Sequence, residues 1–196
     1  MIAAQRVGGC RMDDDLVAGR DCDGCTVCCS ALAIDTPELR KPAGVTCADC
    51  LPGQGCGIYE TRPPVCRAWF CGWRALDWVG EAMRPDRCDV LVYMTEEALP
   101  AGYDRDIGLE FSILSPAGLQ AEGLIDALCR SVRMGLPTFL NVPGHDPAGP
   151  PGRRGARVLL NNPAAGAPTA EAMRHDVTHF YADLRHRRPG EAAAAD

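Results

Sequence analysis

The chain has almost no lysine, no strongly basic region and no long apolar run. Lys41 is the only lysine among 20 basic residues, and the net charge is −6. Neither half therefore offers the basic face that nucleic acid or an anionic membrane surface requires. No stretch approaches the roughly 20 apolar residues of a membrane span, and the N-terminus lacks the apolar run of a signal peptide. The expected location is the cytoplasm.

Catalytic signatures are missing as well. The chain contains no phosphate-binding glycine loop, no H-E-x-x-H helix, no catalytic triad and no pair of carboxylates that can be nominated as acid and base. Any catalysis must therefore be carried by a metal or a cysteine. Cysteine is what the chain has in excess, with twelve residues, eleven of them at or before Cys88. In a reducing cytosol, clustered thiols bind metal or perform redox chemistry more often than they form disulfides.

The cysteines follow the spacing of metal ligands. DCDGCTVCCS (21–30) holds four, and CADCLPGQGCGIYETRPPVCRAWFCGW (47–73) holds five more. C-x2-C spacing occurs three times, and two residues between thiolates allow a tight turn to direct both sulfurs at one ion. The pattern predicts a thiolate-rich metal site formed by nine residues: Cys22, Cys25, Cys28, Cys29, Cys47, Cys50, Cys56, Cys66 and Cys71.

The spacing does not select one metal. Tetrahedral sulfur ligation suits both zinc and iron–sulfur clusters. Cys22, Cys25 and Cys28 have the spacing of a bacterial ferredoxin segment, but Cys29 follows at once and the C-P fourth ligand is absent. Adjacent cysteines direct their side chains apart, so Cys28 and Cys29 can serve different ions. Three states of these cysteines therefore remain as alternatives: bound zinc, bound iron or an iron–sulfur cluster, and disulfides. Nine thiols are enough for two ions, or for one ion and a redox pair.

The same residues resemble a known family. CDGCTVCC, then CADC…GCGIYETRPPVCRAWFCGW and RPDRCDVLVY, are similar to the CxxCxxCC cysteine-cluster proteins, which are described as zinc- or iron-chelating. The match runs from Cys22 to about Val92, a little over a third of the chain. The resemblance implies chelation by Cys22, Cys25, Cys28, Cys29, Cys50, Cys56 and Cys66, with Cys47 and Cys71 present in a subset of members. It also marks Tyr59, Arg62, Pro63 and Arg67 as motif positions.

Arginine and aromatic side chains are expected to support the site. Arg62 and Arg67 are expected to donate hydrogen bonds to thiolates or backbone carbonyls and so to offset negative charge. Large aromatic side chains are expected to pack around the site and exclude water. These are Tyr59, Trp69, Trp73 and Trp78.

Other cysteines and histidines are not expected to be ligands. Cys10 and Cys88 are left unassigned, and Cys129 is expected in the core because it follows the apolar stripe of its helix. His175 and His179 have the spacing of a two-histidine metal face, but they lie opposite an apolar stripe and among arginines. A solvated basic helix face explains them better.

The pattern predicts an α+β fold. Residues 21–88 lack periodicity, so we expect an irregular metal-binding module there, with short helices at 35–42 and 68–78. The pattern of residues 89–190 predicts secondary-structure elements in the order β-β-α-β-β-α. This order favours a small, largely antiparallel sheet with both helices on one face. The predicted strands are 89–95, 109–114, 138–142 and 156–162, and the predicted helices are 115–135 and 169–188. Residues 1–20 are expected to form a flexible leader and 191–196 a frayed tail, with the remainder one compact unit.

Three functions follow as hypotheses. The first is a cytosolic protein that holds zinc, or iron, through cysteine thiolates. The second is an iron or iron–sulfur enzyme of redox or protein-modification chemistry. The third is a metal-stabilised interaction module whose sheet or last helix, with Arg187 and Arg188, docks on a protein partner.

Overall fold

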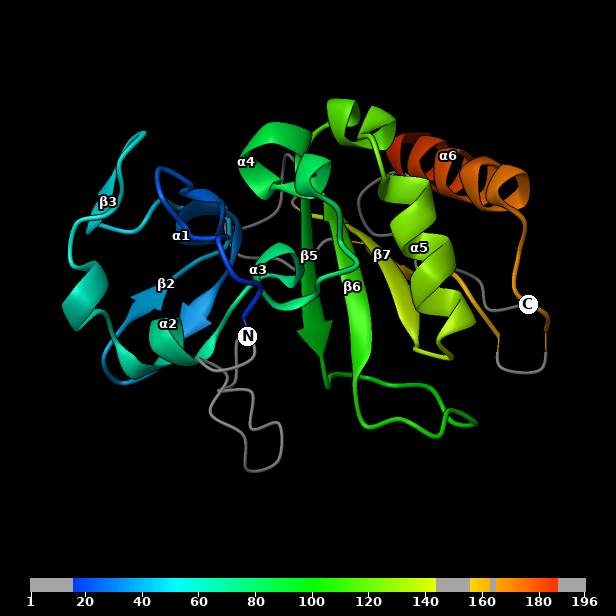
Figure 1. Ribbon diagram of the computed structural model, residues 1–196, viewed down its shortest axis with the longest axis horizontal. Coiled ribbons are helices and arrows are strands. Elements are labelled where there is room, and N and C mark those ends of the chain that lie inside the picture. Colours follow the sequence, from blue (N-terminus) through cyan, green and yellow to red (C-terminus); the bar gives the residue numbers. More distant parts are fainter. Residues whose placement is uncertain (1–15, 144–155, 163–164, 187–196) are drawn as a thin grey trace.

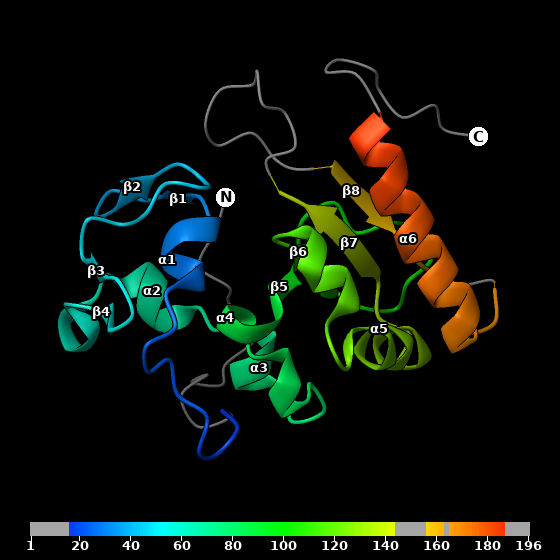
Figure 2. The same cartoon turned by 90° about the horizontal axis from the view of Figure 1, so that it is seen from above.

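The computed structural model describes residues 16–143, 156–162 and 165–186, and it has an α+β fold (Figure 1). A four-stranded mixed sheet and two main helices form the C-terminal part. Residues 21–88, the cysteine-rich segment, lie beyond the edge of this sheet that is formed by β5 (Val90–Thr95). In both views the segment is on the side away from α6 (Ala170–His186) (Figures 1 and 2). None of the helices in the described ranges has the length and apolar character needed to cross a membrane.

The sheet has the order β5-β6-β7-β8, where β6 is Gly108–Ile113, β7 is Thr138–Val142 and β8 is Ala156–Leu159. The outer pairs β5/β6 and β7/β8 are antiparallel, whereas the central pair β6/β7 is parallel. The four predicted strands are therefore present, but the sheet is mixed. The chain between β6 and β7 contains a helix, and such a crossover brings the next strand back in parallel.

The predicted helix over 115–135 is divided into two pieces. The piece η3 (Pro116–Gln120) begins after Ser115, whose hydroxyl accepts the Ala117 N–H at 3.2 Å as a capping residue does. The second piece, α5 (Leu124–Arg133), starts after Gly123, whose φ of 86° breaks the helical path. Helix α6 follows the expected cap, because the Ala172 N–H donates to the Thr169 hydroxyl at 3.1 Å.

The main core lies between one face of the sheet and the two helices. Side chains alternate along β6, so Leu109, Phe111 and Ile113 are all buried on the helix side. They pack with residues from α5 and α6, among them Leu128 and Met173. Cys129 is 2% exposed in this core, as predicted, and Cys88 is buried in it too. His175 and His179 are both exposed, as predicted.

The other face of the sheet carries a polar network. The buried Glu110 carboxylate accepts hydrogen bonds from the Tyr93 hydroxyl and from Asn141 Nδ2 (2.7 Å). Its second oxygen lies 3.2 Å from Arg157 Nε. These partners offset the cost of burying the carboxylate. Trp69 of the cysteine-rich segment packs on Tyr93, with ring centroids 6.1 Å apart, so this face adjoins that segment.

The cysteine-rich segment consists of very short elements. None exceeds five residues, and few of its apolar side chains are buried in comparison with the sheet region. The elements are α1 (Val27–Ala31), β1 (Ile34–Asp35), β2 (Arg40–Lys41), β3 (Cys50–Leu51), β4 (Gly55–Cys56), η1 (Tyr59–Thr61), α2 (Pro64–Ala68), α3 (Gly72–Ala75), η2 (Glu81–Met83) and α4 (Pro85–Cys88).

Two expectations for this segment need correction. Residues 35–42 form no helix, because β1 and β2 pair as an antiparallel hairpin. The turn is held by Thr36, whose N–H donates to the Leu39 carbonyl at 3.0 Å and whose hydroxyl accepts the Leu39 N–H at 3.2 Å. A residue before proline avoids helical backbone, and Thr36 precedes Pro37. Within 68–78, helix α3 spans only Gly72–Ala75.

Two arginines hold Trp73 within the segment, and a glycine brings the segment against the sheet. The Arg20 and Arg84 guanidinium groups lie 5.2 and 5.5 Å from the ring centroid of Trp73. Arg20 also donates to the Trp73 carbonyl at 2.6 Å and to Glu81 at 2.6 Å. Gly72 approaches the sheet closely, since a Cβ there would lie 2.8 Å from Val92 Cγ1.

Several expected features lie outside the described residues. They are most of the leader including Cys10, the tail over 191–196, and Arg187 and Arg188. Residues 16–20 are described, and the Val17 N–H donates to the Arg74 carbonyl at 2.9 Å.

Candidate metal centre

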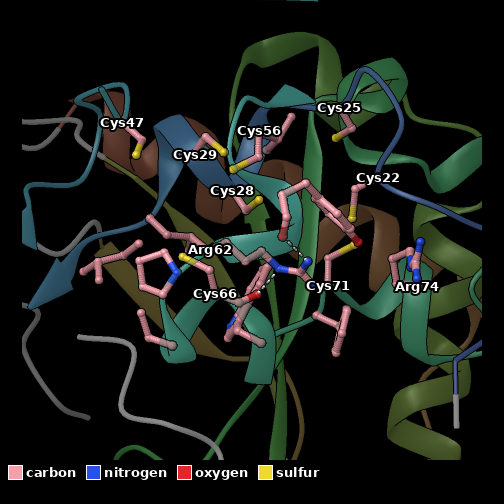
Figure 3. Close-up of a pocket in the computed structure, with 18 of the residues that line it drawn as sticks. Cys22, Cys25, Cys28, Cys29, Cys47, Cys56, Arg62, Cys66, Cys71 and Arg74 are labelled. Carbon is pink, nitrogen blue, oxygen red and sulfur yellow. Dashed lines mark hydrogen bonds between the residues drawn. The ribbon is translucent and has the colours of Figure 1, made fainter. Parts of the chain in front are cut away.

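Eight of the nine predicted cysteines line a single pocket with a cavity of about 100 Å³ (Figure 3). They are Cys22, Cys25, Cys28, Cys29, Cys47, Cys56, Cys66 and Cys71. The ninth, Cys50, interacts with the lining through a side-chain hydrogen bond to Cys29. All eleven cysteines in the described ranges are free thiols. The structure therefore brings together sulfurs that lie up to 49 positions apart in the chain, Cys22 to Cys71.

The first group of ligand candidates comes from a turn and a helix. The Cys25 N–H donates to the Cys22 carbonyl at 2.9 Å, which closes the first C-x2-C turn. Gly24 stands in this turn at a φ of 71°, and a Cβ there would lie 3.3 Å from the Gly53 carbonyl oxygen. Glycine thus permits both the turn and its close contact with the second cysteine stretch. Helix α1 then carries Cys28 and Cys29.

The second stretch is fastened to the first by its backbone. The Cys47 N–H donates to the Cys29 carbonyl at 2.9 Å, and the Cys50 N–H donates to the Cys47 carbonyl at 3.1 Å. Cys50 then pairs with Cys56 across β3 and β4, which places both side chains on the same face of the small hairpin. Cys66 stands on α2, and Cys71 is the residue before α3.

Apolar and aromatic side chains make up most of the rest of the lining, which also includes Asp21, Asp49, Arg62 and Arg74. Tyr59, Trp69 and Trp73 line the pocket, as expected. Trp78 does not. It packs against the main core instead, and the Arg130 guanidinium lies 5.6 Å from its ring centroid. A lining of this kind keeps water away from the thiols, which strengthens electrostatic interactions within the pocket.

Arg62 has the expected supporting role, and it acts through backbone carbonyls. Its Nη1 donates to the Tyr59 carbonyl at 2.7 Å and its Nε to the Cys66 carbonyl at 3.2 Å. Its guanidinium also lies 3.8 Å from the Tyr59 ring centroid. Arg67 is exposed on α2 and does not line the pocket. Arg74, which the motif did not single out, lines the pocket and is buried.

Lys41 is the second residue that the sequence reasoning missed. Its ammonium is buried and donates to backbone carbonyls of Leu32, Val45 (2.9 Å), Pro42 (3.3 Å) and Ser30 (3.4 Å). Burial lowers its pKa, and the nearby thiols Cys47, Cys29, Cys28 and Cys66 act in the opposite direction. A lone lysine in a chain with otherwise only arginine was the one available signal.

The thiols do not share one electrostatic environment. The Cys28 and Cys29 side chains are hydrogen-bonded to one another, so they do not point apart as expected from their adjacency. This contact raises the pKa of Cys28 well above its ordinary value, and together with a hydrogen bond to Cys50 and the charge of Lys41 it lowers the pKa of Cys29 to about 6. Burial raises the pKa of Cys71 to about 11. Bare thiolates would repel one another in such a pocket, so ionising several of them together requires a compensating cation.

The donor set fits a soft metal, although its sulfurs are not gathered around one point. Among the described residues, no group of three or more His, Cys, Asp and Glu side chains forms a ready-made metal-binding arrangement. Two buried N–H donors of pocket-lining residues, Trp73 Nε1 and Arg74 Nε, have no hydrogen-bond partner in the described part of the chain. Unpaired donors of this kind beside thiols suit an anionic thiolate centre.

Comparisons with protein-family models, with curated proteins and with solved structures find no match to this chain.

Proposed function

We propose that this chain is a metal-binding protein that holds zinc, or iron, through cysteine thiolates in the pocket of Figure 3. The observation that carries the proposal is the convergence of eight cysteines, from two separate stretches, on one cavity whose remaining lining is mostly apolar and aromatic, with Arg62, Arg74, Asp21 and Asp49 as its charged members. Soft thiolates select zinc and iron–sulfur clusters over hard cations. Chelation is also what the resemblance to the CxxCxxCC proteins implies, and the reducing cytoplasmic location expected from the sequence would keep the thiols free to bind metal.

Each part of the lining has a role in this proposal. The cysteines hold the metal. Arg62 fixes the backbone around Cys66, and the buried ammonium of Lys41 offsets part of the thiolate charge. Trp73 Nε1 and Arg74 Nε are buried donors of lining residues without a hydrogen-bond partner among the described residues, and in this proposal they donate to thiolate sulfur. The bound metal itself would supply a cross-link for a segment with little core, and an iron centre would add electron transfer.

An iron–sulfur centre is the alternative form of this site, and two observations favour it. The thiols surround a cavity of about 100 Å³, whereas a structural zinc site is closed by its four ligands. Cys22, Cys25 and Cys28 also have a ferredoxin-like spacing. A redox or protein-modification activity would be supported by a centre of this kind.

Metal content after anaerobic purification tests the proposal. We expect zinc or iron in at least a one-to-one ratio to protein, with a visible absorption spectrum only if the metal is iron. The variant Cys28→Ser/Cys29→Ser should lose most of the metal. Cys129→Ser removes a core cysteine outside the pocket and should keep it. Wild-type protein without zinc or iron, or equal metal in both variants, would contradict the proposal.

A further inference from the structure

The cysteines of the pocket fall into two groups. In Figure 3, Cys22, Cys25 and Cys71 lie together beside Arg74, on the right of the view. Cys29, Cys47, Cys56 and Cys66 lie on the left, and Cys28 lies between the groups. A single tetrahedral centre uses four thiolates and would leave five unused in a half-buried pocket.

Electrostatic contacts separate the same groups. Burial has the largest effect on Cys50, Cys66 and Cys71, and the neighbouring thiols that act on them differ between the groups. The thiols that act on Cys71 are Cys22 and Cys25. Those that act on Cys66 are Cys29, Cys47 and Cys56, and the same three act on Cys50. Cys28 is influenced by Cys29 on one side and by Cys22 and Cys25 on the other.

Each group also has a cation nearby and its own place in the fold. Arg84, which is paired with Asp86 at 2.9 Å, acts on Cys25 and is tied to the first stretch by a hydrogen bond to the Asp23 carbonyl. Lys41 acts on Cys29, Cys47 and Cys66 of the second group and on Cys28 between the groups. In the first group, Cys71 immediately precedes α3, which connects this group to the sheet region. In the second group, Cys47, Cys50 and Cys56 lie in the turn and hairpin around β3 and β4, and Cys66 lies on α2. A thiolate centre with excess negative charge is stabilised by such a local cation.

We propose that the pocket contains two thiolate sites that meet at the Cys28–Cys29 pair. Cys22, Cys25, Cys28 and Cys71 hold the first ion. Cys29 holds the second, together with ligands drawn from Cys47, Cys50, Cys56 and Cys66. The adjacent cysteines are thus divided between two ions, which explains why the chain places them side by side. This inference rests on the proposed function, because it assigns ligands within the same pocket.

Zinc stoichiometry of paired variants tests the division. Full-length reduced protein is loaded anaerobically with Zn²⁺ and its mass is measured under native conditions. We expect two ions in the wild type, one in Cys25→Ser/Cys71→Ser and one in Cys47→Ser/Cys66→Ser. The matched control Cys88→Ala/Cys129→Ala removes two cysteines outside the pocket and should keep both ions.

Charge variants provide a second readout that leaves every thiol in place. Lys41→Gln should weaken the binding of the second ion more than that of the first, because Lys41 acts on Cys29, Cys47 and Cys66 of the second site and only on Cys28 of the first; competition with a chelator follows both. One ion in the wild type, or loss of all zinc from either paired variant while circular dichroism stays native, would overturn the division. A wild type that binds no metal at all would instead contradict the proposed function as well.

Discussion

The Cys47 N–H donates to the Cys29 carbonyl oxygen at 2.9 Å, and this bond joins the two cysteine stretches at their backbones. The helix that carries the adjacent cysteines and the second C-x2-C turn are therefore in contact through their backbones. A metal held by sulfurs from both stretches would close the same contact through side chains. The elements themselves are short, so this arrangement has few other supports.

Metal removal should unfold the cysteine-rich segment and spare the sheet. Residues 21–71 contain few buried apolar side chains, whereas the main core is built from the sheet, its two helices and residues from Trp73 onward. We expect anaerobic treatment with a strong chelator to raise deuterium uptake across 21–71, while β5–β8 and α5 stay protected. Uptake measured by mass spectrometry that is the same before and after chelation would show that the segment folds without metal.

Lys41→Met should destabilise the protein by about 2 kcal/mol or more. The change removes a buried ammonium that donates to several backbone carbonyls, including that of Val45 at 2.9 Å, and leaves those carbonyls unpaired. For a chain of this size, the melting temperature should fall by about 4–8 °C. The neighbouring Arg40→Met is the matched control, because Arg40 is 78% exposed and its ion pair with Asp35 lies at the surface. Equal melting temperatures for the two variants would contradict this role of Lys41.

Gly72→Ala should cost about 1–3 kcal/mol of stability. A Cβ at this position would lie 2.8 Å from Val92 Cγ1 and 3.3 Å from the Val92 carbonyl oxygen. Val92 is 1% exposed in β5 and has little room to move. Gly80→Ala is the control, since a Cβ there meets nothing within 4 Å, and we expect it to stay within about 0.5 kcal/mol of wild type. Urea unfolding of both variants checks the difference.

Cys88 should make the folded protein less stable in alkali. Burial raises the pKa of Cys88 from 9.0 to about 11. Between these values the unfolded chain loses the thiol proton and the folded chain keeps it, so stability that is present below pH 9 is lost as the pH rises toward 11. We expect the stability advantage of wild type over Cys88→Ala to shrink by about 1–2 kcal/mol between pH 7.5 and pH 10.5. An advantage that does not change with pH would contradict the prediction.

Much of the sheet region was predictable because its patterns are local. Alternation in β6 and the capping residues Ser115 and Thr169 mark the elements directly. The strand–helix–strand order around α5 also indicated that β6 and β7 pair in parallel. The prediction of a largely antiparallel sheet did not take this order into account. The break at Gly123 was harder to foresee, because a glycine inside a periodic segment is often tolerated.

The cysteine-rich segment was less predictable, since tertiary contacts decide its structure. The cysteine spacing predicted a shared site, and eight of the ligand candidates line one pocket. The spacing did not predict the hairpin of β1 and β2, which is held by Thr36 and the buried Lys41. Trp78 was expected near the thiols and instead packs against the main core, because periodicity is absent there and burial depends on distant residues. Lys41 and Arg74 were missed for the same reason.

X-ray absorption at the metal edge of anaerobically purified protein tests the central claim most directly. The account predicts an innermost shell of sulfur alone, with about four sulfur atoms per metal at about 2.3 Å. The Cys28→Ser/Cys29→Ser variant, which takes one ligand from each proposed site, should hold less metal with fewer sulfur atoms per metal, and Cys129→Ser should keep the wild-type shell. A shell of nitrogen and oxygen ligands, or a pocket variant with the wild-type shell and metal content, would contradict the account.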